Sequence, residues 1–184
     1  KSLDEALTHG GINNNIKVNL IRIESDKLKS SQVNKELKKV SAILIPGGFG
    51  KRGTEGKISA INFARRKKIP FLGICFGMQM AVIEFARNVL KMKKAGSTEF
   101  DINCYPVIGL IDEWNKNGKI IKGTRKDLGG TMRLGLYEAK LKHNSMIKNI
   151  YKSGSIKERH RHRYEVNNNL KNKFEEKGMI FSGM

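Results

Sequence analysis

Short apolar runs alternate with amphipathic stretches through the first half of the chain. Residues 42–45 and 69–74 are apolar runs next to glycines, as is typical of buried strands that enter tight loops. Residues 55–68 and 77–90 carry apolar positions at helical spacing, and the second stretch is apolar nearly all round. Strands that alternate with helices form βαβ units. The pattern therefore predicts an α/β fold with a doubly wound, mostly parallel open sheet and flanking helices.

The rest of the chain predicts further elements with less regular spacing. Apolar positions alternate over 16–24, which predicts a strand, and Gly10 and Gly11 suggest the end of a helix that includes 3–7. We also expect helices over 33–40, 145–151 and 169–177, a turn at 115–118, and extended segments at 106–111, 119–122, 134–141, 157–166 and 179–181.

Both ends of the chain lie close to expected elements of the core. The chain begins inside the helix expected at 3–7 and stops just after the strand expected at 179–181. A doubly wound domain usually starts with a central strand, and none precedes residue 1. We therefore expect residues 1–184 to be one domain that is a fragment, truncated at both ends.

Composition adds a strongly basic balance. Lys and Arg number 36 against 17 Asp and Glu, which gives a formal net charge of +19. This excess suggests a nucleic-acid partner, but the lysines are scattered among asparagines and form no block of about five or six like charges. A solvated, lysine-rich surface explains them better. A basic nucleic-acid-binding α/β module remains the alternative from a different functional class.

Cysteine content and hydropathy narrow the compartment. Cys75 and Cys104 are too few for a disulfide framework in 184 residues and suit a reducing compartment, so we expect a cytoplasmic protein. No apolar run approaches the roughly 18–20 residues of a membrane-spanning helix, so we expect no membrane partner.

The most informative local feature surrounds Cys75. An expected strand runs into Cys75, an expected helix follows at once, and Gly73 and Gly77 flank the cysteine two residues away on each side. This layout is typical of a nucleophile elbow, with Cys in place of Ser. The helix N-terminus favours a thiolate, and the Phe76 amide can stabilise a developing oxyanion. A small buried cysteine that only packs at a strand end is the alternative, but packing does not require both glycines.

A second glycine-rich loop follows the other expected buried strand. Residues 46–50 read Pro-Gly-Gly-Phe-Gly. In an open α/β sheet such loops line the ligand crevice, so their amides can complete an oxyanion hole opposite Cys75. The loop lacks the Gly-Lys-Ser/Thr of a P-loop and is therefore not a nucleotide site of that kind.

Together, residues 46–50 and 73–79 resemble the class I (triad) glutamine amidotransferases. Within that class, residues 52–57, 97–100, 129–135 and 158–167 resemble motifs of the glutaminase domain of CTP synthases. The resemblance implies a domain that hydrolyses L-glutamine through a cysteine thioester and passes ammonia to a synthetase domain, where UTP activated by ATP becomes CTP. Another triad amidotransferase, of the GMP synthase or anthranilate synthase type, is the alternative, and the last two motifs argue against it.

The resemblance also implies roles for individual residues. Cys75 would be the nucleophile, and the amides of Gly48 and Phe76 would form the oxyanion hole. The residues implied in glutamine binding are Gly48, Phe76, Gly77, Met78, Gln79, Glu99 and Arg163. Glutamine carries an α-ammonium and an α-carboxylate, which suit the carboxylate of Glu99 and the guanidinium of Arg163.

The chain departs from the family at the catalytic base. The family uses a His and a Glu in a His-Pro-Glu element, and the histidines of this chain all lack that context: His9, His143, His160 and His162. A cysteine nucleophile without this base lacks support for its thiolate and an acid for the leaving ammonia. We therefore expect the chain to be catalytically incomplete as given.

The resemblance implies neither a cofactor nor a metal in this domain. ATP and Mg would bind in the absent N-terminal synthetase domain, GTP is an implied activator, and the full enzyme is implied to be a homotetramer. His160 and His162 supply too few ligands for a metal site, and their role stays open.

Overall fold

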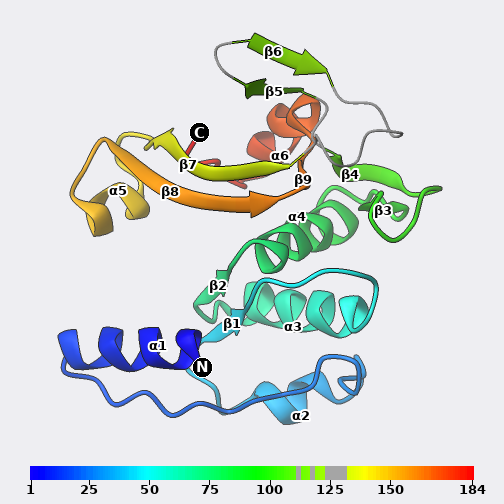
Figure 1. Ribbon diagram of the computed structural model, residues 1–184. Helices are drawn as coiled ribbons and strands as arrows, with labels where there is room; N and C mark the ends of the chain where they lie inside the picture. Colours follow the sequence, from blue (N-terminus) through cyan, green and yellow to red (C-terminus); the bar gives the residue numbers. More distant parts are fainter. Residues whose placement is uncertain (111–112, 117–118, 123–131) are drawn as a thin grey trace.

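The first half of the chain forms a βαβ unit that leads into a long helix (Figure 1). A computed structural model describes residues 1–110, 113–116, 119–122 and 132–184. β1 (Ile43–Ile45) and β2 (Phe71–Gly73) pair in parallel, with Ile45 opposite Gly73. α3 (Thr54–Lys67) connects the two strands, and α4 (Phe76–Asn88) follows β2. The elements predicted near 42–45, 55–68, 69–74 and 77–90 are confirmed.

The other elements surround this unit. Two helices precede it, α1 (Ser2–Asn13) and α2 (Val33–Leu37). The elements that follow are β3 (Ala95–Ser97), β4 (Tyr105–Leu110), β5 (Glu113–Lys116), β6 (Lys119–Lys122), β7 (Arg133–Lys140), α5 (Met146–Tyr151), β8 (Ser155–His162), β9 (Tyr164–Val166), the 3-10 turn η1 (Asn168–Leu170) and α6 (Lys171–Glu176).

The strand pairings confirm an α/β fold with parallel strands. β1 pairs with β2 and β3 with β4 in parallel, while β4 with β9, β5 with β6 and β7 with β8 are antiparallel. Among the described residues these pairings form four small sheets. Residue 111 of the strand expected at 106–111, residues 117–118 of the expected turn, and residues 129–131 of the motif 129–135 lie outside the described residues.

The strand predicted at 16–24 does not form. This segment has no strand pairing, and Ile16 and Ile21 are 63% and 66% exposed. Among the described strands, β1 pairs with β2 alone, so no ladder partner lies beside the segment. An alternating pattern selects the two faces of a strand, but the strand also needs a neighbour for its hydrogen bonds.

The C-terminal end of α1 and the segment after α6 also differ from the prediction. α1 continues through Gly10 and Gly11 and ends at Asn13. The backbone of Ile16 packs closely against Gly11, where a Cβ would lie 2.6 Å from the Ile16 carbonyl oxygen. The strand expected at 179–181 is absent: after Gly178, the Met179 amide donates to the Phe174 carbonyl oxygen (3.1 Å) and closes α6.

The hydrophobic core lies where α3, α4 and α6 pack against the strands. Met80 and Ile83 of α4, Ile108 of β4 and Phe174 of α6 are fully buried. β2 was expected to be buried, but Leu72 is 54% exposed, so one face of this strand is open. No helix within the described ranges is long and apolar enough to cross a membrane.

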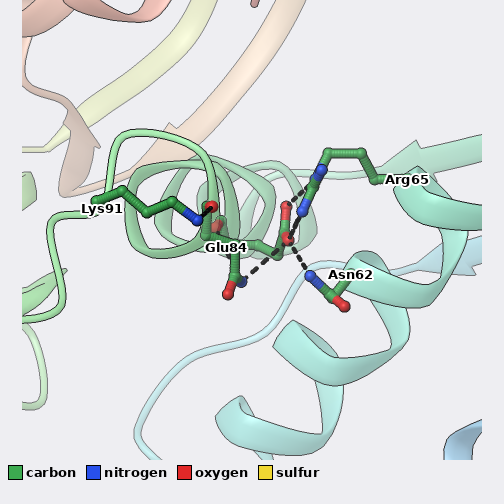
Figure 2. Close-up of polar contacts among 5 residues, drawn as sticks. Asn62, Arg65, Glu84 and Lys91 are labelled. Carbon is green, nitrogen blue, oxygen red and sulfur yellow. Dashed lines mark hydrogen bonds and ion pairs between the residues drawn. The ribbon is translucent and has the colours of Figure 1, made fainter.

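A buried carboxylate joins α3 to α4 (Figure 2). Glu84 is 1% exposed and accepts hydrogen bonds from Asn62 Nδ2 (2.7 Å) and Asn88 Nδ2 (3.0 Å). Arg65 donates to both carboxylate oxygens, from Nη2 at 2.8 Å and from Nε at 2.9 Å. The hydrogen bond from Arg65 to Glu84 raises the pKa of the guanidinium. The charge is tolerated in the core because both oxygens have donors.

Replacing Glu84 with Gln should lower the free energy of unfolding by about 2–3 kcal/mol, since it removes a buried charge and turns an amide donor toward other donors. The matched control is Glu55→Gln, which breaks another α3–α4 ion pair, with Arg87, at a residue whose side chain is 76% exposed. This control should cost less than about 1 kcal/mol. Urea unfolding of both variants measures the difference, and equal losses would contradict the account.

Candidate active site

Cys75 lies on the turn between β2 and α4, as the N-cap of α4. Its φ of 52° and ψ of −105° are rare for a residue with a side chain and cost about 1–3 kcal/mol. The Gly77 amide donates to the Ile74 carbonyl oxygen (2.9 Å) and the Gln79 amide to the Cys75 carbonyl oxygen (3.1 Å), so backbone hydrogen bonds hold the turn. Cys75 is exposed. The strand, turn and helix predicted around this cysteine are confirmed.

Both flanking glycines are required by close backbone contacts. A Cβ on Gly77 would collide with the carbonyl oxygen of Ile45 in β1. A Cβ on Gly73 would lie 2.6 Å from the Gly77 carbonyl carbon. Real Cβ atoms do not tolerate such distances, so without glycine at position 77 the start of α4 could not lie this close to β1, and without glycine at position 73 it could not lie this close to β2.

The loop at 46–50 lies beside Cys75. A Cβ on Gly47 would be 3.7 Å from the Cys75 Cβ, and one on Gly48 would be 3.8 Å from Cδ1 of Phe76. The parallel register of β1 and β2 explains this position, because their carboxyl ends meet at one edge.

Glu99 reaches the same loop from a distant part of the sequence. Its Oε1 accepts a hydrogen bond from the Gly50 amide at 2.7 Å. The Glu99 amide in turn donates to the Ser97 Oγ (3.2 Å), and Ser97 is fully buried at the end of β3. The turn after β3 therefore holds a carboxylate at the glycine-rich loop.

Gln79 connects the first turn of α4 to the segment that contains Arg163. The Gln79 side chain is buried, and its Nε2 donates to the carbonyl oxygen of Tyr164 (2.9 Å). Burial and the nearby negative charge of Glu99 raise the pKa of Tyr164, while Arg163 opposes this shift. Glu99 and Arg163 thus each lie within electrostatic reach of Tyr164.

Phe76 is buried and lies beside Lys57, a residue to which the sequence analysis assigns no role. The Lys57 Nζ lies 5.7 Å from the centroid of the Phe76 ring, a cation–π distance. It also donates to Ser25 Oγ (2.9 Å) and to the Arg52 carbonyl oxygen (3.3 Å). Burial lowers the pKa of Lys57. The motif 52–57 pointed to this stretch, but Ser25 had no signal in the sequence.

The structure brings most of the predicted site residues to one edge of the β1–β2 sheet. Gly48, Cys75, Phe76, Gly77 and Glu99 meet there through the contacts above. Met78, on the next position of α4, is 43% exposed. The Gln79 side chain faces the Tyr164 carbonyl, a contact that the sequence did not predict.

His160 and His162 form a pair instead of joining a larger cluster. Nδ1 of His160 and Nε2 of His162 are 3.0 Å apart. Burial lowers the pKa of both imidazoles, which favours their neutral forms. Within the described part of the chain, no three His, Cys, Asp or Glu side chains gather in a way that would hold a metal ion.

A hollow of about 860 Å³ lies at the other end of α4. Its lining includes Leu90, Met92, Tyr105 and several lysines. α4 has 13 residues, so this hollow lies about 20 Å from Cys75. It is therefore separate from the elbow.

Comparison with known sequences gives one family. The sequence model described as "Glutamine amidotransferase class-I" matches residues 1–183. The chain is 72% identical over 184 residues to a CTP synthase of Pelagibacter ubique and 56% identical over 185 residues to a CTP synthase of Rhizobium johnstonii. In both cases all of the chain is covered, together with 34% of the relative. The chain thus spans about a third of the length of these relatives.

A solved structure shares the fold. The glutaminase domain of a Trypanosoma brucei CTPS with bound acivicin matches with a TM-score of 0.86 and 33% sequence identity. The match covers 99% of this chain and 67% of that chain.

The two cysteines should differ in reactivity toward a glutamine-like electrophile. Cys104 is half-buried against Gly96, and burial together with Asp101 raises the pKa of its thiol. Cys75 is exposed at a helix N-terminus, so it should be alkylated at least about tenfold faster. Mass spectrometry of the labelled peptides over time gives both rates. Equal rates would contradict the assignment of Cys75 as the reactive thiol.

Proposed function

The chain belongs to the class I glutamine amidotransferase family, and from this premise we propose that it is the glutaminase domain of a CTP synthase. It hydrolyses L-glutamine and supplies ammonia for the ATP-dependent amination of UTP to CTP, a step of pyrimidine nucleotide synthesis. The similarity of the whole chain to CTP synthases supports this choice over the GMP synthase and anthranilate synthase types.

The observation that carries the proposal is the position of Cys75 at the start of α4, beside the loop 46–50. Cys75 Sγ attacks the side-chain amide carbon of glutamine, and the electron pair of the carbonyl bond moves to its oxygen. The amides of Gly48 and Phe76 donate to that oxygen. The carbon–nitrogen bond then breaks, the nitrogen leaves as ammonia with the proton that the Cys75 thiol gave up, and a thioester remains on Cys75. Water attacks the thioester carbon, which releases glutamate and the thiol.

Recognition of the substrate uses its two charged α-groups. One oxygen of Glu99 accepts a hydrogen bond from the Gly50 amide, and the carboxylate has further lone pairs that can accept from an α-ammonium. Arg163 acts on the pKa of Tyr164, as Glu99 does in the opposite direction, and its guanidinium is suited to the α-carboxylate. Gly77, Met78 and Gln79 complete this binding segment through the first turn of α4.

A base must take the proton of the thiol, and the same group must then deliver a proton to the leaving nitrogen. The family places this group in a His-Pro-Glu element. None of the four histidines of the chain precedes Pro-Glu. We therefore infer that the 184-residue chain alone turns over glutamine very slowly, because the nucleophile and oxyanion hole lack their proton carrier.

We propose the other components of the enzyme from the similarity of this chain to CTP synthases. ATP and Mg bind in the synthetase domain, GTP acts as an activator, and the full enzyme is a homotetramer. The free thiols of Cys75 and Cys104 fit a reducing compartment such as the cytoplasm.

Ammonia release tests the proposal. The chain alone is compared with a chimera in which it replaces the matching third of the Pelagibacter ubique CTP synthase, together with the chimera carrying Cys75→Ser. The chimera should release ammonia from glutamine, and the chain alone and the Cys75→Ser chimera should each be at least about a thousandfold slower. Comparable turnover by the isolated chain would mean that one of its own histidines is the base. Activity in the Cys75→Ser chimera would exclude Cys75 as the nucleophile.

A further inference from the structure

Arg163 lies where the chain changes from one sheet to another. β8 ends at His162 and pairs with β7, whereas β9 begins at Tyr164 and pairs with β4. Arg163 is the single residue between the two strands, so neither ladder includes it. The course of the backbone at Arg163 therefore depends on the contacts that hold its two neighbours, His162 and Tyr164.

His162 fixes this corner through its own side chain. Its Nδ1 lies 3.1 Å from the Tyr164 carbonyl oxygen, two residues further along the chain. A carbonyl oxygen only accepts, so Nδ1 must carry the proton and donate. In a neutral ring Nε2 is then an acceptor, and His160 Nδ1, at 3.0 Å, must donate to it. The distances thus determine the tautomers of both histidines.

The Tyr164 carbonyl oxygen also accepts a hydrogen bond from α4, the helix that follows Cys75. Gln79 Nε2, in the first turn of α4, donates to the Tyr164 oxygen at 2.9 Å. One carbonyl therefore joins the elbow helix to the β7–β8 hairpin, directly after Arg163. The two lone pairs of the oxygen are both used.

The hairpin supports the two imidazoles from behind. The ring of His160 meets Tyr137 edge to face at a centroid distance of 5.3 Å. Arg133 lies 5.4 Å from the centroid of Tyr137 and forms an ion pair with Glu165 at 3.1 Å. Burial lowers the pKa of both histidines, and Arg133 acts in the same direction on each, which favours the neutral rings. At His162 the neighbouring His160 also lowers the pKa, whereas the hydrogen bond to the Tyr164 carbonyl raises it. Glu158 opposes this effect at His160.

We propose that His162, supported by His160, is a positioning residue that directs Arg163 toward the α-carboxylate of glutamine. This inference rests on the proposed function, since it assigns Arg163 to the substrate. It gives the two histidines a role in substrate binding through the backbone, without contact with the reacting atoms. The hydrogen bond from Nδ1 to the Tyr164 carbonyl is the feature that matters for this role.

Two substitutions at His162 separate this bond from simple loss of the ring. The side-chain amide nitrogen of Asn can occupy the place of Nδ1 and donate to Tyr164, whereas that of Gln lies nearer the place of Nε2. In the chimera, His162→Gln should raise the KM for glutamine about three- to tenfold, with kcat within about twofold of the parent. His162→Asn should keep both constants within about twofold. His160→Gln, which removes only the support, should raise KM by about two- to threefold, and an unchanged KM in this variant would contradict the supporting role of His160.

The control is His143→Gln, at an exposed residue on the connection that follows β7, which should leave both constants unchanged. Equal effects of Gln and Asn at position 162 would contradict the proposal, as would a fall in kcat with an unchanged KM. A thermal midpoint for each variant identifies any that fails to fold, and in that case His160→Gln decides between the outcomes.

Binding measured without turnover distinguishes this inference from the proposed function. Calorimetry with L-glutamine on the chimera carrying Cys75→Ser gives a dissociation constant. Adding His162→Gln should raise this constant about three- to tenfold. Absence of binding by the unsubstituted His162 protein would contradict the proposed function itself. Binding that His162→Gln leaves unchanged would contradict only the positioning role.

Discussion

The start of α4 rests on the end of β1 through a contact that has no side chain. Gly77 lies so close to the Ile45 carbonyl oxygen that any Cβ would overlap it, and Gly73 packs against Gly77 in the same way. Because the helix begins this close to the strand, the chain must turn sharply at Cys75, which therefore adopts a positive φ. The same approach places the loop 46–50 beside the cysteine. The strained nucleophile and the neighbouring amides are thus consequences of one backbone contact.

Polar contacts then attach later parts of the chain to this centre. Glu99 binds the Gly50 amide from the turn after β3, and Gln79 binds the Tyr164 carbonyl from α4. Away from the site, Glu84 ties α4 to α3 within the core and so fixes the direction of the helix that carries the elbow. Apolar burial supplies most of the stability of such a domain, whereas these directional bonds select one arrangement of the site.

The elements that the sequence predicted are those whose reasons lie in adjacent residues. The apolar run at 42–45, the helical spacing at 55–68 and the glycines around Cys75 depend on neighbours, and the structure confirms these elements. The strand expected at 16–24 depends on a distant partner, and alternation cannot supply one. The same reason applies to the site: the bond from Gly50 to Glu99 spans 49 residues and that from Gln79 to Tyr164 spans 85, and no local pattern specifies either pairing.

The most direct test of this account is the ratio of the alkylation rates of Cys75 and Cys104 in a Gly77→Ala variant. Gly154→Ala is the control, because a Cβ there meets no atom within 4 Å. If the Gly77 contact creates the elbow, the added methyl group moves α4 away from β1, and the ratio should fall at least about tenfold while the control keeps the parent ratio. A Gly77→Ala chain that stays folded and retains the parent ratio would show that the reactivity of Cys75 does not depend on this contact.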